Sequence, residues 1–161
     1  MLAVARPAAA QLGCSGATCT VEITMPVVDV LRLSLSVPGI SLGSPSEADF
    51  AAGHKDVIGP GVTATVKANR AFQVQVGGAT GTFQYAGSAP DPAKPASDLL
   101  WSTSQAGLSA TSTHMGMTSM LLNQGTGGSV QAMIYMRTLW SFLRDVPGNY
   151  SMSVRLTLSA P

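Results

Sequence analysis

Residues 147–158 read PGNYSMSVRLTL, and this stretch decides the fold class. Large side chains stand at every second position from Tyr150 to Leu158, while Ser, Arg and Thr occupy the positions between them. A period of two is typical of a β-strand with one buried face and one face in water. Pro147-Gly148 fits the two central positions of a type II turn, which we expect to lead into this strand.

The same alternation recurs along most of the chain and predicts a protein built from strands. Asn69-Arg70 marks a bend or a tight hairpin between two of these runs, and the most helix-like stretch, residues 138–144, is short. Residues 19–25 and 31–36 predict two strands, or one strand broken at Pro26. The remaining expected strands are residues 62–68, 72–76, 81–86, 98–102 and 130–138. This pattern predicts an all-β fold, an immunoglobulin-like antiparallel β-sandwich of seven to nine strands.

Length and charge restrict the kind of protein further. The chain has 161 residues, of which 45% are hydrophobic and only 11% are charged, with a net charge of +1. This size fits one domain, which we place at residues 13–161. The composition excludes a highly charged disordered chain, and the balanced charge argues against a nucleic-acid-binding face. We expect no membrane span, because the sequence has no run of eighteen apolar residues.

The N-terminal segment points to export. Residues 1–12 are rich in Ala, and Ala8-Ala9-Ala10 before Gln11 has the small-residue pattern of a signal-peptidase site, so we interpret this segment as a signal-peptide remnant or a disordered tail. Cys14 and Cys19, the two cysteines, follow it closely. They predict a local disulfide in an oxidising compartment, or else two unpaired thiols. A zinc site is disfavoured because no second ligand pair exists.

The two ends of the predicted domain resemble a known family. Cys19-Thr20-Val21 opens the domain, and residues 147–158 close it with a Gly-x-Tyr turn and an alternating strand. This pattern resembles the secreted bacterial pilin-like sandwiches of the spore coat protein U type and related surface β-sandwich proteins. The resemblance implies an exported protein without a cofactor that serves as a fibre subunit or a surface-matrix component.

Motifs for catalysis are weak in this sequence. Gly39-Ile40-Ser41-Leu42-Gly43 matches the Gly-x-Ser-x-Gly nucleophile elbow, with His54 as a conceivable base. That elbow requires a strand before it and a helix after it on a parallel sheet, whereas Pro38 and Pro45 flank this one. Glu47 and Asp49 form the closest acidic pair, which we interpret as a solvated loop. We therefore predict no enzymatic activity.

Two further groups of side chains suggest ligand binding. Trp101 and Trp140 are candidates for a sugar-stacking platform, although we expect at least one of them in the core. The cluster of His114, Met115, Met117 and Met120 carries imidazole and thioether groups, which suit copper. Because methionine also fills apolar gaps in a core, we favour packing over metal binding for this cluster.

These observations together predict a non-catalytic exported protein, located in the periplasm, in the medium or on the cell surface. We expect a fibre, matrix or adhesion subunit that associates with other chains, including copies of itself, by pairing of strand edges. The first and the last predicted strands lie near the ends of the chain, so either can be donated to a neighbour or completed by one. The alternative is a module that binds carbohydrate or another small ligand through exposed aromatic rings.

Overall fold

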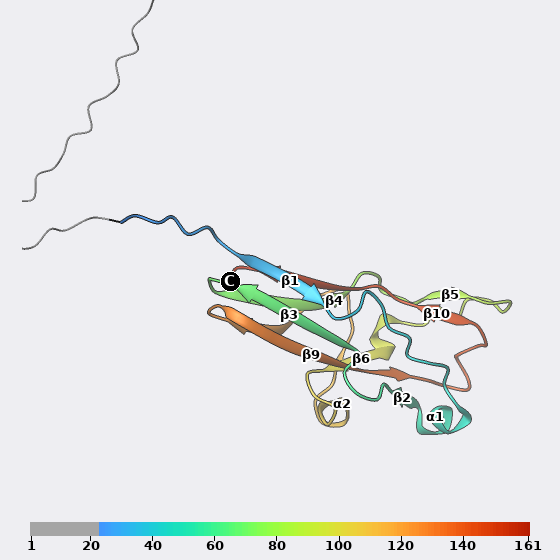
Figure 1. Ribbon diagram of the computed structural model, residues 1–161. Helices are drawn as coiled ribbons and strands as arrows, with labels where there is room; N and C mark the ends of the chain where they lie inside the picture. Colours follow the sequence, from blue (N-terminus) through green and yellow to red (C-terminus); the bar gives the residue numbers. More distant parts are fainter. Residues whose placement is uncertain (1–22) are drawn as a thin grey trace, which may run out of the picture.

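The computed structural model describes residues 23–161, and these form an immunoglobulin-like antiparallel β-sandwich, as predicted (Figure 1). Eleven strands occur among these residues, instead of the seven to nine expected, because several are only two or three residues long. Three short helical segments are α1 (Glu47–Ala52), η1 (Ala96–Asp98) and α2 (Gly107–Ala110). None of the helices in this part of the chain is long and apolar enough to cross a membrane. The strands are β1 (Leu31–Leu35), β2 (His54–Asp56), β3 (Val62–Ala68), β4 (Phe72–Gly78), β5 (Gln84–Ala86), β6 (Leu99–Ser102), β7 (Thr113–His114), β8 (Met120–Gly125), β9 (Gly128–Leu139), β10 (Asn149–Ser151) and β11 (Val154–Ser159).

The strands form two main sheets with different widths. The larger sheet has the order β1-β3-β9-β6-β7, and β2 pairs with the end of β9 beyond β3. The smaller sheet has the order β11-β4-β8, and β10 pairs separately with β5. Every one of these pairings is antiparallel. The long strand β9 therefore organises the larger sheet, while β4 holds the centre of the smaller one.

The core lies between the two sheets and follows the predicted alternation. In β3, Ala64 and Val66 point inward, and in β4 Phe72, Val74 and Val76 do the same, each at most 2% exposed. The intervening Thr and Gln residues are only half-buried. Alternation in residues 62–68, 72–76 and 130–138 thus identified the central strands correctly, because these strands pack one face against the opposite sheet.

The C-terminal run of alternation is interrupted in the structure. We predicted one strand from Tyr150 onward, whereas Met152 and Ser153 separate β10 from β11. The chain changes partners there, since β10 pairs with β5 and β11 pairs with β4. Of the two alternatives for Asn69-Arg70, the bend is confirmed and the tight hairpin is wrong, because these residues connect β3 and β4, which belong to different sheets.

The helices occur where none was predicted. Residues 138–144 contain the end of β9 and a turn, whereas α1 lies in the stretch that we expected to be a loop. Ser46 and Asp49 form a capping box at its start: Ser46 Oγ accepts from the Asp49 N–H at 3.3 Å, and the Asp49 carboxylate accepts from the Ser46 N–H at 2.8 Å. Gly53 ends the helix with a left-handed φ of 75°. The Glu47/Asp49 pair therefore belongs to a helix N-terminus.

The turn before β10 also differs from the prediction. A type II turn needs a positive φ at its second central residue, and Gly148 does not have one. Glycine is required there for space, because a Cβ at position 148 would lie 2.3 Å from the Tyr85 ring. The Tyr85 hydroxyl donates to the Pro147 carbonyl at 2.7 Å, which keeps the ring against this turn.

We expect Gly148→Ala to destabilise the domain by about 1–3 kcal/mol, because either the Tyr85 ring or the turn must move. Thermal or urea unfolding measures the change in the free energy of unfolding. Gly39→Ala is the matched control, since a Cβ at position 39 meets no heavy atom within 4 Å. Equal stability of the two variants would contradict this explanation of Gly148.

Candidate assembly groove

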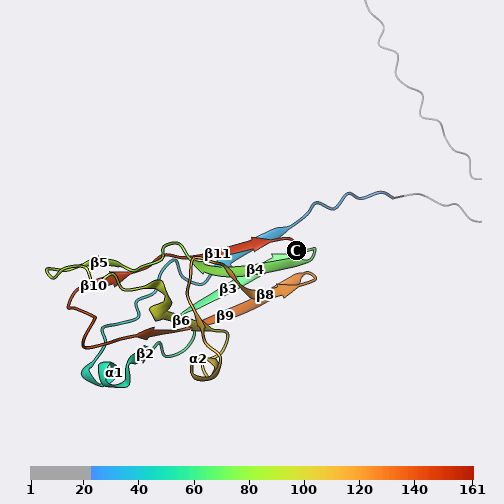
Figure 2. The ribbon, with the colours of Figure 1, turned by 180° about the vertical axis from the view of Figure 1, so that it is seen from behind.

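Two edge strands from different sheets face each other along one side of the sandwich. In the described part of the chain, β1 has one hydrogen-bonded neighbour, β3, and β11 has one, β4. The two edges approach each other without pairing, and Figure 2 shows β11 running along the same side of the domain as β1. Each edge therefore leaves backbone N–H and C=O groups available to another strand.

A groove of about 680 Å³ lies along this side of the sandwich. One wall is Leu35 with residues 37–45, and the other is residues 148–154 with Leu156. The floor consists of residues from the sandwich interior, including Phe83, Leu99, Ile134 and Met136. We call this feature the groove.

The walls of the groove expose apolar side chains that only partly complete the core. Ile40 and Leu42 on one wall, and Val154 and Leu156 on the other, are half-buried and pack against the central cluster. A β-sandwich normally covers such side chains with a strand from one of its own sheets. The groove therefore has the lining of a strand position that no described residue fills.

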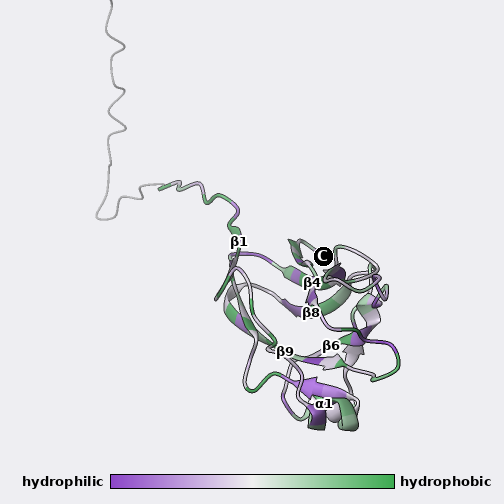
Figure 3. Ribbon diagram, turned by 90° about the vertical axis from the view of Figure 1, so that its right-hand side faces the viewer, coloured by the Kyte–Doolittle hydropathy of each residue, from purple (hydrophilic) through white to green (hydrophobic). Residues whose placement is uncertain are grey.

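The segment immediately before β1 leaves the domain in an extended conformation. We call residues 23–30 the tail segment, and none of them belongs to a helix or strand (Figures 1 and 3). Its apolar side chains are highly exposed: Ile23 is 88%, Met25 79% and Val27 78% exposed. The predicted strand at residues 19–25 is therefore not formed by residues 23–25, and residues 19–22 lie outside the described part of the chain.

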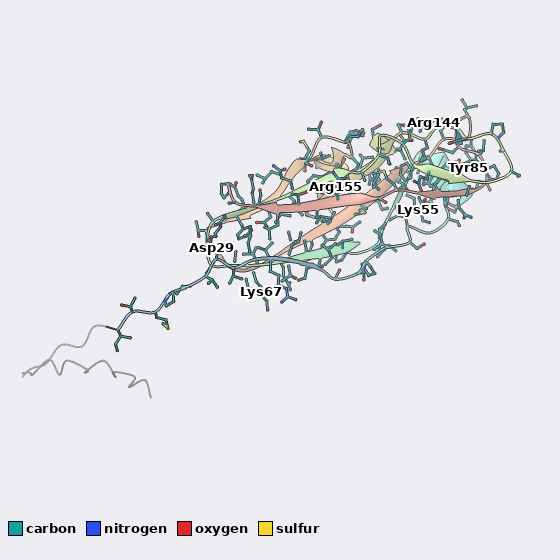
Figure 4. The ribbon with its side chains drawn as sticks, turned by 90° about the horizontal axis from the view of Figure 1, so that it is seen from above. Asp29, Lys55, Lys67, Tyr85, Arg144 and Arg155 are labelled. Atoms are coloured by element: carbon teal, nitrogen blue, oxygen red, sulfur yellow. The ribbon has the colours of Figure 1, made fainter. Side chains whose placement is uncertain are left out.

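Asn69 fixes the point at which the tail segment leaves the domain. Its side chain accepts from the Val30 N–H and donates to the Val28 carbonyl, each at 2.8 Å. Arg70 adds an ion pair with Asp29. Figure 4 places Asp29 at the end of the domain where the tail leaves, and Tyr85 and Arg144 at the opposite end, which we call the distal end. The tail segment is thus directed away from the groove of its own chain.

Aromatic side chains line the groove where it reaches the distal end. Tyr150 packs against Tyr85 and Trp140, with ring centroids 5.2 and 5.6 Å apart, and Phe50 stacks on Phe142 at 4.8 Å. A second cavity of about 420 Å³ is lined by four of these rings, Phe50, Phe142, Trp140 and Tyr150, of which Trp140 and Tyr150 also line the groove.

Tyr150 also anchors the turn before β10. Its hydroxyl accepts from the Val146 N–H at 3.0 Å and donates to the Val146 carbonyl at 2.7 Å. This hydrogen bond to the backbone a few residues upstream resembles the one made by the tyrosine corner of immunoglobulin-like domains. Burial raises the pKa of the Tyr150 phenol above its ordinary value, although the backbone hydrogen bond to Val146 opposes this change. The hydroxyl is therefore neutral at physiological pH, as its donation to Val146 requires.

An ion pair ties β2 to β9 beside α1. The Asp56 carboxylate accepts from Arg137 Nε at 2.5 Å and Nη2 at 2.8 Å. These hydrogen bonds lower the pKa of Asp56 from its ordinary value and raise that of Arg137. The bonded carboxylate holds the end of β9 against β2, next to the wall of the groove.

We expect this pair to make stability depend on pH in the acidic range. Because the pKa of Asp56 is lower in the folded state, its contribution is present above the unfolded value near 3.9 and is lost as pH falls through the folded value. Asp56→Asn should therefore flatten the decline of stability below about pH 4. Urea unfolding at several pH values measures this slope, and Glu47→Gln, which removes an exposed carboxylate, is the charge-matched control. An unchanged slope in Asp56→Asn would contradict the assignment.

The structure separates the two tryptophans proposed as a ligand platform. Trp101 lies in β6 within the core and is 5% exposed, so it offers no ring face to a sugar, in agreement with the expectation that at least one of the two rings is buried. Trp140 is half-buried beside the groove. Lys94 Nζ lies 4.3 Å from the centroid of its ring, so the protein itself already occupies one face.

The proposed soft-metal cluster is divided between the core and the surface. Met115 is 2% exposed and belongs to the core, while Met117 and Met120 are 68% and 47% exposed. The Nδ1 atom of His114 lies 2.7 Å from the Ser97 carbonyl oxygen. Packing in the core explains Met115, in agreement with the preference for packing over metal binding.

The remaining sequence motifs have structural roles or lie outside the described residues. The segment Gly39–Gly43 is a wall of the groove, where Ser41 Oγ accepts from the Gly43 N–H at 3.3 Å. His54 Nδ1 lies 3.0 Å from the Ala52 carbonyl oxygen, near the end of α1. The signal-peptide segment 1–12 and the Cys14/Cys19 pair lie outside the described residues, so both remain predictions.

Comparison with known proteins adds one structural likeness. No family model and no curated protein matches the chain. Among solved structures, the chain is similar to a chain of a chaperone-usher pilus, at a TM-score of 0.49 and 11% sequence identity. That structure is described as revealing the molecular basis of the uncoiling of the pilus rod. The similarity covers 89% of this chain and 96% of the pilus chain. The resemblance to the spore coat protein U type stays a prediction, and the function has to be inferred from the groove and the tail segment of this chain.

Proposed function

We propose that this protein is a non-catalytic subunit of an extracellular fibre, assembled by insertion of the N-terminal strand of one copy into the groove of the next. The observation that carries the proposal is the combination of a groove that none of residues 23–161 fills with an exposed, alternating apolar segment directly before β1. Addition of a strand to exposed sheet edges supplies main-chain hydrogen bonds, while alternate side chains fill the pockets.

The pattern of residues 19–25 suits the groove. Cys19, Val21, Ile23 and Met25 alternate with Thr20, Glu22 and Thr24, so that a strand of these residues has one apolar face. Pro26, which lacks an N–H, marks the end of the strand. The apolar face would lie on the groove floor, and the polar face would remain in water.

Burial of the apolar face of this strand contributes a free energy comparable to the cost of association. Full burial of an aliphatic or Met side chain contributes about 1.5–3 kcal/mol, so Ile23 and Met25 together contribute about 3–6 kcal/mol. Val21 and the backbone hydrogen bonds add to this value. Association itself costs several kcal/mol in lost rotational and translational freedom, which the full strand has to offset.

The geometry favours an open chain of copies over a closed pair. The tail segment leaves one end of the domain, held there by Asn69, while the groove extends to the distal end. A tail on one surface and a groove on another make a head-to-tail contact, which produces filaments when the rotation between copies does not close. Export, as the N-terminal segment predicts, would place such a filament outside the cytoplasm.

A photo-crosslinking residue at position 23 of the full-length chain tests the proposal. We expect covalent dimers and higher ladders, with the crosslink mapped by mass spectrometry to residues 37–45 or 149–156 of a second copy. The same residue at position 58 is the control, because Ile58 is 98% exposed and lies outside the groove. The proposal is wrong if the chain stays monomeric by light scattering over the accessible concentration range, or if position 23 crosslinks elsewhere.

A further inference from the structure

Lys94 is a buried amine whose surroundings are unusual for a lysine. Its side chain is 1% exposed, and its Nζ atom has three oxygen partners. It donates to the Leu139 carbonyl at 2.6 Å and to Asp145 Oδ1 at 2.8 Å, and it lies 3.1 Å from Asp98 Oδ2. The fibre proposal makes no use of this group, which connects residues far apart in the sequence.

The two carboxylates around Lys94 are held in different ways. The Asp145 side chain is 1% exposed, and its second oxygen, Oδ2, accepts from the Ser141 N–H at 2.8 Å. Asp98, 7% exposed, also accepts from Arg144 at 2.5 Å. The Trp140 and Tyr150 rings lie 4.3 and 6.0 Å from Lys94 Nζ. One amine and two carboxylates, with side chains 1%, 1% and 7% exposed, thus meet between the groove, which Lys94 lines, and the second cavity, which Asp145 lines.

We propose that Lys94 and Asp145 form an intramolecular isopeptide bond, with Asp98 as the proton carrier. Asp98 takes a proton from the Lys94 ammonium and passes it to Asp145 Oδ1, which leaves a neutral amine beside a neutral carboxyl group. Nζ then attacks Asp145 Cγ, and negative charge develops on Oδ2, where the Ser141 N–H stabilises it. Asp98 moves a second proton from nitrogen to Oδ1, this oxygen departs as water, and the amide remains.

The burial of these groups favours the amide over the ion pair. The step converts one ammonium and one carboxylate into one neutral amide and one water molecule, and Asp98 is regenerated, so no oxidant or cosubstrate is required. Ion pairs removed from water carry a large desolvation cost, which the neutral amide avoids. The fold holds Lys94 Nζ 2.8 Å from Asp145 Oδ1, so no bimolecular encounter is needed. Burial of both side chains slows hydrolysis of the amide once it has formed.

The bond would close a covalent loop at the distal end. It joins the segment before η1 to the connection between β9 and β10. This connection carries Trp140 and leads into β10, which carries Tyr150, and both rings line the groove. A chain with this crosslink keeps the distal end intact when it is pulled or denatured. The inference stands on the Lys94 site and does not depend on fibre assembly.

Peptide mapping of the purified full-length protein tests the bond directly. Trypsin cuts poorly before proline, so Lys94-Pro95 stays within the peptide 71–137, while Asp145 begins the peptide 145–155. We expect these two peptides to be joined, with the loss of one water molecule from their summed mass. Recovery of both as separate, unmodified peptides from the folded protein would overturn the proposal.

Three variants identify the roles of the residues. Lys94→Arg and Asp98→Asn should each abolish the joined peptide, the first by removing the nucleophile and the second by removing the proton carrier. Lys55→Arg is the matched control, because the Lys55–Asp49 pair at 3.3 Å is more exposed, and it should leave the joined peptide in full yield. Circular dichroism of Asp98→Asn checks that the sandwich is folded. A joined peptide in folded Asp98→Asn would remove Asp98 from the mechanism.

Discussion

A full-length chain that carries both Ile23→Asp and Met25→Asp should remain monomeric under conditions in which the unaltered chain forms oligomers. Both side chains are exposed in the isolated chain, at 88% and 79%, so the substitutions do not disturb the core. In the assembled state they would lie on the apolar floor of the groove, where an unpaired carboxylate is strongly disfavoured. Size-exclusion chromatography with light scattering measures the loss, and electron microscopy shows whether fibres disappear.

The control for this variant lies on the same segment. Thr24→Asp and Glu22→Gln alter the charge on the opposite face of the inserted strand, which stays in water, so both chains should assemble like the unaltered protein. Leu143→Asp alters a fully exposed side chain at the distal end and tests whether any new charge disrupts association. The proposed register places Ile23 and Met25 in the groove and Thr24 in water. It would be wrong if Thr24→Asp reduced assembly as much as the double variant does.

The sequence predicted the central strands well because their environment is regular. Residues in β3, β4 and β9 alternate between the core and a wetter surface, and this two-residue period is visible in the sequence itself. The period fails where an element changes partners. From Tyr150 to Leu158 the alternation is unbroken, yet the pairing partner changes along it. The first part, β10, pairs with β5, and the second part, β11, pairs with β4. Alternation reports which side a residue faces and not which strand it pairs with.

The incorrect prediction of a strand at residues 23–25 bears on the proposed assembly. The alternation from Cys19 to Met25 is as regular as that in β3, but Ile23 and Met25 find no partner within the described part of the chain. Such an alternating segment without a partner in the described part of its own domain fits the expectation from the sequence that the first strand can be donated to a neighbour, which is the basis of the proposed assembly. The groove itself could not be predicted, because it is formed by Leu35 to Pro45 and Gly148 to Leu156, which meet only in the folded domain.

Other parts of the distal end were equally hidden from sequence reasoning. Lys94 and Asp145 are separated by 51 positions, and neither belongs to a sequence motif that predicts a buried ion pair. Gly148 was interpreted through the conformational freedom of glycine, whereas the Tyr85 ring accounts for it. In each case the reason is a contact between segments distant along the chain, which composition and periodicity do not report.

A synthetic peptide of residues 17–27 should stabilise the monomeric double variant. Ile23→Asp with Met25→Asp leaves the groove intact but removes the strand that fills it, so this chain is a suitable receptor. The peptide binds the folded state and not the unfolded one, and at a hundredfold excess over its Kd it contributes about 2.7 kcal/mol. For a domain of this size, that value corresponds to a rise in Tm of about 5–10 °C.

Differential scanning calorimetry measures this rise, and its dependence on peptide sequence shows whether the groove is the site. A peptide with Cys19→Ala keeps a small apolar side chain on the inserted face and avoids disulfide exchange, so it should still raise Tm, whereas one with Ile23→Asp and Met25→Asp should leave Tm unchanged. Leu42→Arg in the receptor places a charge on the wall of the groove, and it should abolish the rise for every peptide. A rise in Tm that persists in the Leu42→Arg receptor would show that the peptide binds outside the groove.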